Sequence, residues 1–116
     1  MTSIMLVIGF LANPTITTTI TTPVFSQEGS VSIAPGAADP NNDQSFDPPQ
    51  INLPIESTVF WTNDDSTQHT VTSDDGSFDS GPLSPGDRFD NTFDTSGEFG
   101  YHCAIHPFMT GVVIVN

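Results

Sequence analysis

The sequence predicts an all-β domain, and three observations support that prediction. Ten prolines and nine glycines are spread along the 116 residues, which favours short elements joined by turns. No stretch shows the periodic apolar spacing of an amphipathic helix, whereas several short segments alternate apolar and polar residues as half-buried strands do. The chain is long enough for one domain and too short for two.

Residues 1–26 differ from the rest of the chain and are interpreted as a targeting segment. The apolar run IMLVIGFLA is followed by a threonine-rich stretch, and the first charged residue is Glu28. The run is short for a membrane span and fits the core of a secretory signal, with Val24 and Ser26 as small residues before the cut. The basic start of a signal is missing, so an uncleaved N-terminal anchor with a Thr-rich linker is the alternative. We expect export, and one domain at residues 27–116.

The first half of this domain contains two predicted strands separated by a loop. SVSIAP forms the first strand, and the polar, proline-rich segment PGAADPNNDQSFDPP forms the loop. A longer strand lies in INLPIESTVFWTN. Its alternation places Ser57, Val59, Trp61 and Asn63 on one face, because successive strand residues point to opposite sides.

Four further strands are predicted in the second half. HTVTS places His69 on the same side as its apolar Val71, and DRFDNTFDT turns Phe89 and Phe93 inward. GEFGYHC aligns its aromatic side chains with Cys103, and GVVIVN is a final buried strand. About seven or eight short strands of this kind predict an antiparallel sandwich or barrel.

The charge balance excludes some partners. The chain carries fourteen acidic residues against one cation, Arg88, for a formal net charge of −13. Such a surface offers almost no cation to neutralise phosphate, so it repels nucleic acid and anionic membranes. It suits a basic protein partner, or it serves only to keep the protein soluble, and the sequence leaves both interpretations open.

The segment CAIHPFM contains the chain's one cysteine, and Cys103, His106 and Met109 follow one another at intervals of three residues. A lone cysteine excludes an internal disulfide, a two-cysteine zinc site and a dinuclear copper centre with two thiolates. Strand alternation directs Cys103 and the upstream His69 toward the same inner end of the sandwich. His102 points away from Cys103, so it is interpreted as a surface histidine.

Together His69, Cys103, His106 and Met109 supply two imidazoles, a thiolate and a thioether. Soft sulfur combined with imidazole selects copper, and a set of two histidines and a cysteine with a weak axial methionine is typical of a blue-copper centre. Zinc gains little from a thioether, and a hydrolytic zinc site needs a carboxylate base, which CAIHPFMTG lacks. Taken singly, the methionine and the cysteine are more typical of core packing.

With these residues in place, the segment from Val59 to Val115 resembles the cupredoxin family, the small blue copper proteins that include plastocyanin, pseudoazurin and amicyanin. VFWTND…QHTV is similar to the family's first-ligand region, and GEFGYHCAIHPFMTGVVIV is similar to its ligand loop and last strand. The short gap between His106 and Met109 is most similar to amicyanin. The resemblance implies a cupredoxin-like Greek-key β-sandwich of eight strands, with one type 1 copper at one end.

The resemblance also implies roles for individual residues. His69, Cys103 and His106 would be the strong in-plane ligands, and Met109 the axial ligand.

Three further roles are implied around these ligands. Asn63 would tie the first-ligand strand to the cysteine loop by hydrogen bonds. Pro107 and Phe108 would lie in an apolar collar around the edge of His106, whereas Tyr101 is interpreted as a core residue.

The implied function is one-electron transfer between Cu(I) and Cu(II), in an exported, periplasmic or extracellular monomer. Its partners would be redox proteins that bind transiently and are basic, and membrane contact would come only from an N-terminal anchor. An enzyme would need a second copper site, for which only His102 is left, so the chain is predicted not to be an enzyme. The alternatives are a copper carrier or buffer that delivers metal to a copper enzyme, and an adhesion sandwich without metal.

Overall fold

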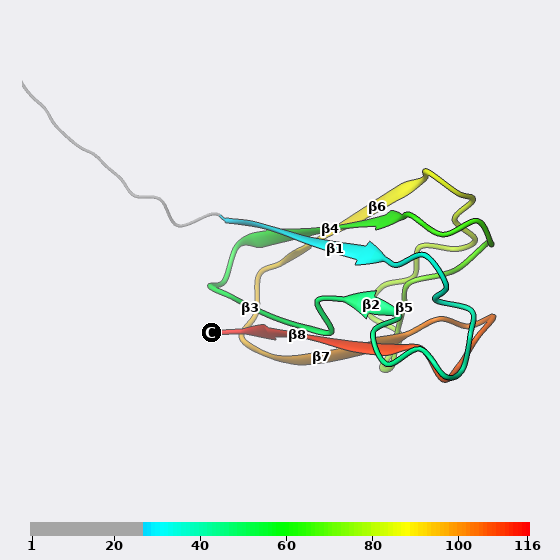
Figure 1. The fold of residues 1–116 in the computed structure, drawn as a ribbon. Helices are drawn as coiled ribbons and strands as arrows, with labels where there is room; N and C mark the ends of the chain where they lie inside the picture. The colour runs from blue at the N-terminus through cyan, green and yellow to red at the C-terminus, as the bar shows by residue number, and fades with distance from the viewer. Residues whose placement is uncertain (1–26) are drawn as a thin grey trace, which may run out of the picture.

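The computed structural model describes residues 27–116, and these residues form eight strands and no helix (Figure 1). The strands are β1 (Glu28–Ile33), β2 (Phe46–Asp47), β3 (Gln50–Leu53), β4 (Ser57–Asn63), β5 (Thr72–Ser73), β6 (Arg88–Phe93), β7 (Gly97–His102) and β8 (Thr110–Val115). The predicted targeting segment lies outside the described residues. In the part of the chain that is described, no helix could cross a membrane. The prediction of an all-β fold with about eight strands is confirmed.

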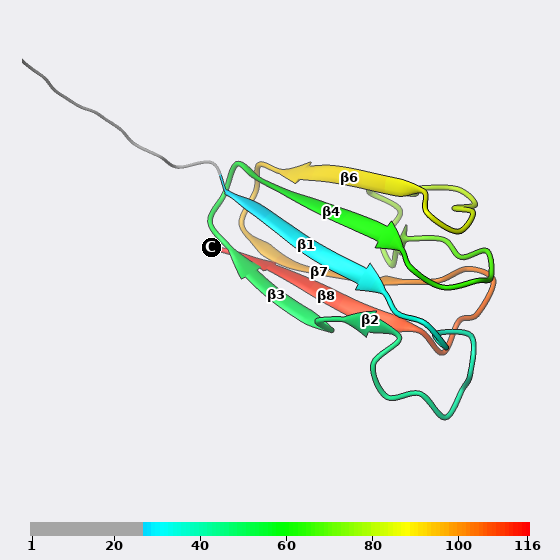
Figure 2. The ribbon, with the colours of Figure 1, turned by 45° about the horizontal axis from the view of Figure 1, so that its top comes forward.

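Two four-stranded sheets pack face to face (Figure 2). One sheet has the strand order β2-β1-β4-β6, and the other has the order β3-β8-β7-β5. The prediction of a purely antiparallel sandwich is wrong for two pairings, because β1 pairs with β4 and β3 pairs with β8 in parallel. Two strands can pair in parallel here because the chain crosses from one sheet to the other between them. The alternation of side chains along a strand does not predict where the chain crosses.

Strand β4 forms the centre of the core, and its predicted face is confirmed. Every second residue from Ser57 to Asn63 is buried. The Trp61 ring packs edge-on against Tyr101, with 5.3 Å between the ring centroids. Tyr101 in turn needs a glycine opposite it, because a Cβ on Gly111 would clash with the Tyr101 ring. The aromatic core therefore ties β4 to β7, the strand that leads to the cysteine.

The proline-rich segment contributes more to the core than its composition predicts. It contains β2, whose Phe46 is fully buried and stands 4.8 Å from the Tyr101 ring centroid. Ala37 is also fully buried. One aromatic residue among polar neighbours gives no periodic pattern, so the sequence indicated only a loop here.

The segment 69–73 was predicted as a strand, but only Thr72–Ser73 is one. Upstream of it, His69 forms only an isolated bridge with Leu83, and side chains accept the next two N–H groups. The Thr70 N–H donates to Cys103 Sγ (3.3 Å), and the Val71 N–H donates to Ser80 Oγ (2.8 Å). His69, Thr70 and Val71 are all buried, so burial does not alternate along this segment as it would in the predicted strand.

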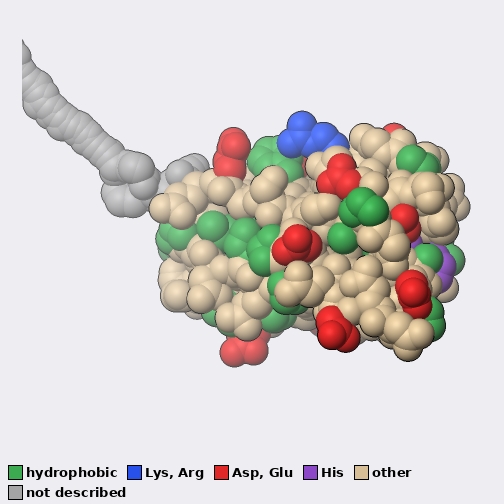
Figure 3. Space-filling model, viewed as in Figure 1, with side chains coloured by type: hydrophobic (Ala, Val, Ile, Leu, Met, Phe, Trp, Pro, Cys, Tyr) green, Lys and Arg blue, Asp and Glu red, His purple; other side chains and the backbone are tan. Residues whose placement is uncertain are grey.

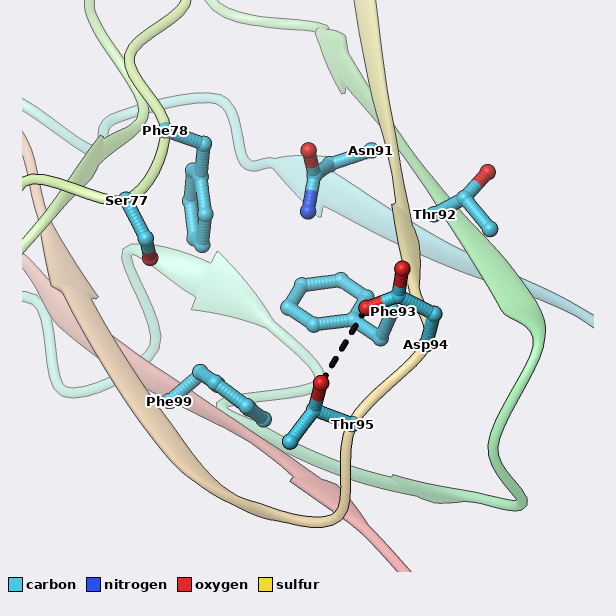
Figure 4. A pocket seen from close by; sticks show the side chains of 8 residues that line it. All are labelled: Ser77, Phe78, Asn91, Thr92, Phe93, Asp94, Thr95 and Phe99. Carbon is cyan, nitrogen blue, oxygen red and sulfur yellow. Dashed lines mark hydrogen bonds between the residues drawn. The ribbon is translucent and has the colours of Figure 1, made fainter.

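A cleft of about 230 Å³ lies beside β6 and β7 (Figure 4). Its lining combines the rings of Phe78, Phe93 and Phe99 with polar side chains, and the Thr95 hydroxyl donates to Asp94 at its edge (3.2 Å). None of the predicted metal ligands lines this cleft.

Candidate metal centre

Three of the predicted ligands converge at one end of the sandwich. Cys103 Sγ lies 3.7 Å from Nδ1 of His69 and 3.7 Å from Nδ1 of His106. The three donor atoms all lie within 4.8 Å of one another. The loops that carry them, β4–β5 and β7–β8, meet at the end of the sandwich remote from the C-terminus (Figure 1).

Met109 belongs to the same loop and is wholly buried. Its N–H donates to the His106 carbonyl (2.9 Å), and its own carbonyl accepts the Cys103 N–H (3.1 Å). These two bonds close the loop on itself, so the backbone positions of Cys103, His106 and Met109 depend on one another. Three of the predicted ligands, Cys103, His106 and Met109, thus lie in the β7–β8 loop. The fourth, His69, lies in the buried segment that faces this loop.

His69 has a different partner on each ring nitrogen. Nδ1 faces Cys103 Sγ, and Nε2 lies 2.7 Å from Oδ2 of Asp65. An ionised carboxylate can only accept, so Nε2 carries the proton and the lone pair of Nδ1 is available for a metal. Burial acts to raise the pKa of Asp65, but hydrogen bonds from His69 and from the Gly36 and Ser66 N–H groups outweigh it and leave the pKa lowered. Asp65 is therefore ionised at neutral pH.

Thr70 connects the buried segment to the cysteine loop. Its N–H donates to Cys103 Sγ (3.3 Å), and its Oγ1 accepts the Ala104 N–H (2.8 Å). The same hydroxyl lies 2.9 Å from Oγ1 of Thr72. Sequence reasoning missed both Asp65 and Thr70, and their closeness in the chain to His69 was the one signal available.

The prediction that Asn63 forms hydrogen bonds to the cysteine loop is wrong. The Asn63 amide donates to the carbonyls of Thr67 and Leu83 (2.9 Å each), and its Oδ1 accepts the Asp65 N–H (3.0 Å). Asn63 thus braces the segment that leads to His69, whereas Thr70 makes the link to the cysteine loop. The prediction failed because a buried amide near a site bonds to whichever backbone groups lie within its reach, and only the fold shows which these are.

His102 lies outside the donor cluster, as predicted. Its Nδ1 is 2.7 Å from Oδ1 of Asp74, on the partly exposed side of β7. Its ring therefore has a partner that is unrelated to Cys103.

The rim of the site is apolar. His106 is only partly buried, and its neighbours Ile105 and Phe108 are 47% and 45% exposed. The Phe108 ring lies 6.0 Å from the His106 ring in an edge-on arrangement. Figure 3 shows histidine surface at this end of the molecule, beside hydrophobic side chains.

The donor set fits a copper ion. Two imidazole nitrogens and one cysteine sulfur are preorganised, the methionine beside them is buried, and the one nearby carboxylate is engaged by the far nitrogen of His69. Soft sulfur with imidazole suits copper, and the three donor atoms, all within 4.8 Å of one another, are close enough to reach one ion. Within the described residues, this is the one group of three or more side chains placed to hold a metal.

The chain is similar to a family of known proteins. The family model described as "Cupredoxin-like domain" matches residues 15–115. Amicyanin from Paracoccus denitrificans is 30% identical over 76 residues, which cover 61% of this chain and 58% of that protein. Chloroplastic plastocyanin from Tetradesmus obliquus is 32% identical over 84 residues, again 61% of this chain and 58% of that protein. The chain thus spans somewhat more than half the length of these relatives.

Solved structures show the same fold. A purple cupredoxin from Nitrosopumilus maritimus superposes with a TM-score of 0.70 and 35% identity, over 76% of this chain and 99% of that chain. A copper-containing nitrite reductase from Thermus scotoductus superposes with a TM-score of 0.63 and 25% identity, over 77% of this chain but only 22% of that chain. The fold therefore occurs both alone and as part of a larger enzyme.

Proposed function

This chain belongs to the cupredoxin-like family, and we propose that it is a small blue copper protein that carries single electrons through one type 1 copper site. The observation that carries the proposal is the convergence of Cys103 Sγ with Nδ1 of His69 and of His106. The similarity to amicyanin and plastocyanin supports it.

The proposed ligands have distinct roles. His69, Cys103 and His106 would bind the copper strongly, and Met109 would be the weak fourth ligand. Copper, when bound, supplies the interconversion of Cu(II) and Cu(I). Cys103 would bind as a thiolate, since metal binding releases the thiol proton without a separate base.

The chain itself keeps these ligands in place. His69 is held by Asp65, and the Thr70 hydroxyl holds the backbone just after Cys103. Pro107 restricts one backbone angle between His106 and Met109. A site that is rigid before metal enters needs little rearrangement when its charge changes, which favours fast electron transfer.

We propose that electrons pass through the exposed edge of His106. The apolar side chains of Ile105 and Phe108 border that edge and offer a small surface for a transient complex. The net charge of −13 favours a basic redox partner, and association should weaken as salt screens the attraction. Association that does not depend on salt would contradict the choice of a basic partner. We propose that the protein acts as a monomer.

We also propose that the chain is not an enzyme and that it works outside the cytoplasm, in the periplasm or at the outer face of the membrane. The match to the nitrite reductase covers only 22% of that protein, so it does not carry the enzyme's activity to this chain. Export rests on the apolar start of residues 1–26, which would form a signal or an anchor ahead of a domain at residues 27–116. The mass of the protein recovered from an exporting host would show whether this segment is removed.

The proposed function is tested by adding one equivalent of Cu(II) to the metal-free protein and recording the visible spectrum. We expect an intense blue or green band from thiolate-to-copper charge transfer, and Cys103→Ala should abolish it completely. A colourless protein would contradict the proposal. Transfer of Cu(I) to a competing chelator then separates the two copper functions, since a copper carrier should release the metal rapidly and an electron carrier should retain it.

A further inference from the structure

The second nitrogen of His69 is bound by a buried carboxylate, and the proposed function does not account for it. Resting on the proposed copper site, we propose that Asp65 is a positioning residue that orients His69 for the metal and lowers the reduction potential of the bound copper. Two observations support this inference, the geometry of the pair and the fixing of the carboxylate. The negative charge of a carboxylate gives the direction of the expected effect.

The geometry of the pair is that of a strong hydrogen bond. Nε2 of His69 lies 2.7 Å from Oδ2 of Asp65, and the side chains are 0% and 7% exposed. A bond of this length between an imidazole N–H and a carboxylate is charge-assisted, and low exposure protects it from competing water. It defines the tautomer of His69 and directs Nδ1 at Cys103 Sγ.

Asp65 is itself held in place, both at its carboxylate and at its backbone. Its other oxygen, Oδ1, accepts the Gly36 N–H from the β1–β2 loop (3.1 Å). The Asp65 backbone N–H donates to Oδ1 of Asn63 (3.0 Å). Rotation of the Asp65 side chain away from His69 would break the bond to Gly36, while the bond to Asn63 holds the Asp65 backbone. The carboxylate thus has a fixed position, and it fixes the orientation of the histidine ring.

The charge of Asp65 acts on the metal through His69. The oxidised site carries one more positive charge than the reduced site, so a buried negative charge stabilises the oxidised form more. An anionic partner also makes the imidazole a stronger donor, with the same effect. The adjacent Asp64 has the same charge but a different environment. It is exposed, and its carboxylate accepts the Ser32 hydroxyl (2.5 Å) and not the N–H of a proposed copper ligand. Solvent screens its charge.

The test compares Asp65→Asn with Asp64→Asn, since the two changes alter the net charge equally. We expect Asp65→Asn to retain the blue band, to shift the reduction potential to more positive values, and to weaken copper binding by about 10- to 100-fold. Asp64→Asn should leave both quantities near those of the wild type. Asp65→Glu, which keeps the charge but moves it, should restore only part of the affinity. Equal shifts in the two Asn variants would overturn the proposal.

A second readout needs no copper. In nuclear magnetic resonance spectra of the metal-free protein, the Nε2–H proton of His69 should be protected from exchange with water in the wild type and in Asp64→Asn. In Asp65→Ala this signal should be lost while the dispersed amide spectrum shows that the protein remains folded. A signal that survives in Asp65→Ala overturns the positioning role. A wild type without the blue band would instead refute the copper site, while this measurement still tests the hydrogen bond.

Discussion

The buried segment that carries His69 and the β7–β8 loop that carries His106 face each other across Cys103, and they differ in exposure and in bonding. His69 is fully buried, with Asn63, Asp65 and Thr70 bonded around it. The β7–β8 loop is braced mainly by its own backbone, and the side chains beside its histidine are exposed. The contrast assigns different tasks to the two sides. The buried side holds the geometry, while the exposed side is free to meet a partner.

The largest loss of stability is expected when the hydrogen bonds of Asn63, on the buried side of the site, are removed. Asn63→Ala leaves the Thr67 carbonyl and the Asp65 N–H without partners, and the Leu83 carbonyl keeps only the His69 N–H, so the free energy of unfolding should fall by about 3 kcal/mol. Chemical denaturation of the metal-free protein measures this. Asn52→Ala is the matched control, because Asn52 is exposed and bonds only Gln50, and its loss should stay within about 0.5 kcal/mol. Equal losses would mean that Asn63 does not brace the site.

The core under the site should also respond to alkaline pH. Burial raises the pKa of Tyr101 to about 12, from 10.0 for an exposed tyrosine. The unfolded chain therefore ionises first, so this contribution to stability is fully present below pH 10 and is lost as the pH rises toward 12. The loss should reach up to about 3 kcal/mol. Tyr101→Phe should remove it, and a variant with an unchanged alkaline profile would contradict the assignment.

Thr70 joins the two sides, and its removal should have a smaller effect. Thr70→Val keeps the N–H that donates to Cys103 Sγ but leaves the Ala104 N–H without an acceptor. We expect a loss of about 1 kcal/mol in the free energy of unfolding and a broader spread of geometries at the site. Electron paramagnetic resonance of the Cu(II) form would report that spread as broadened lines. Thr70→Ser retains the hydroxyl and should behave as the wild type.

Changes on the exposed side should scarcely affect stability. Phe108→Ser should alter the free energy of unfolding by no more than about 0.5 kcal/mol, since the ring is 45% exposed. It should slow electron transfer from a small basic cytochrome by about tenfold, the equivalent of about 1.4 kcal/mol of docking energy. Stopped-flow absorbance would measure the rate. Ile55→Ser is the control, because Ile55 is 43% exposed and lies at the far end of the sandwich. If both variants slow transfer equally, the rim of His106 is not the docking surface.

The longer strands β1, β4, β6, β7 and β8, the faces of β4 and the four candidate ligands could be predicted from the residues alone. These features are local, because alternation and the spacing of CAIHPFM are properties of neighbouring residues. The parallel pairings, the burial of Phe46 and the supports of the site became visible only in the folded chain. Thr70 and Cys103 are 33 residues apart, and Gly36 and Asp65 are 29 apart. Such contacts depend on how the two sheets pack against each other, and the pattern of neighbouring residues does not predict this packing.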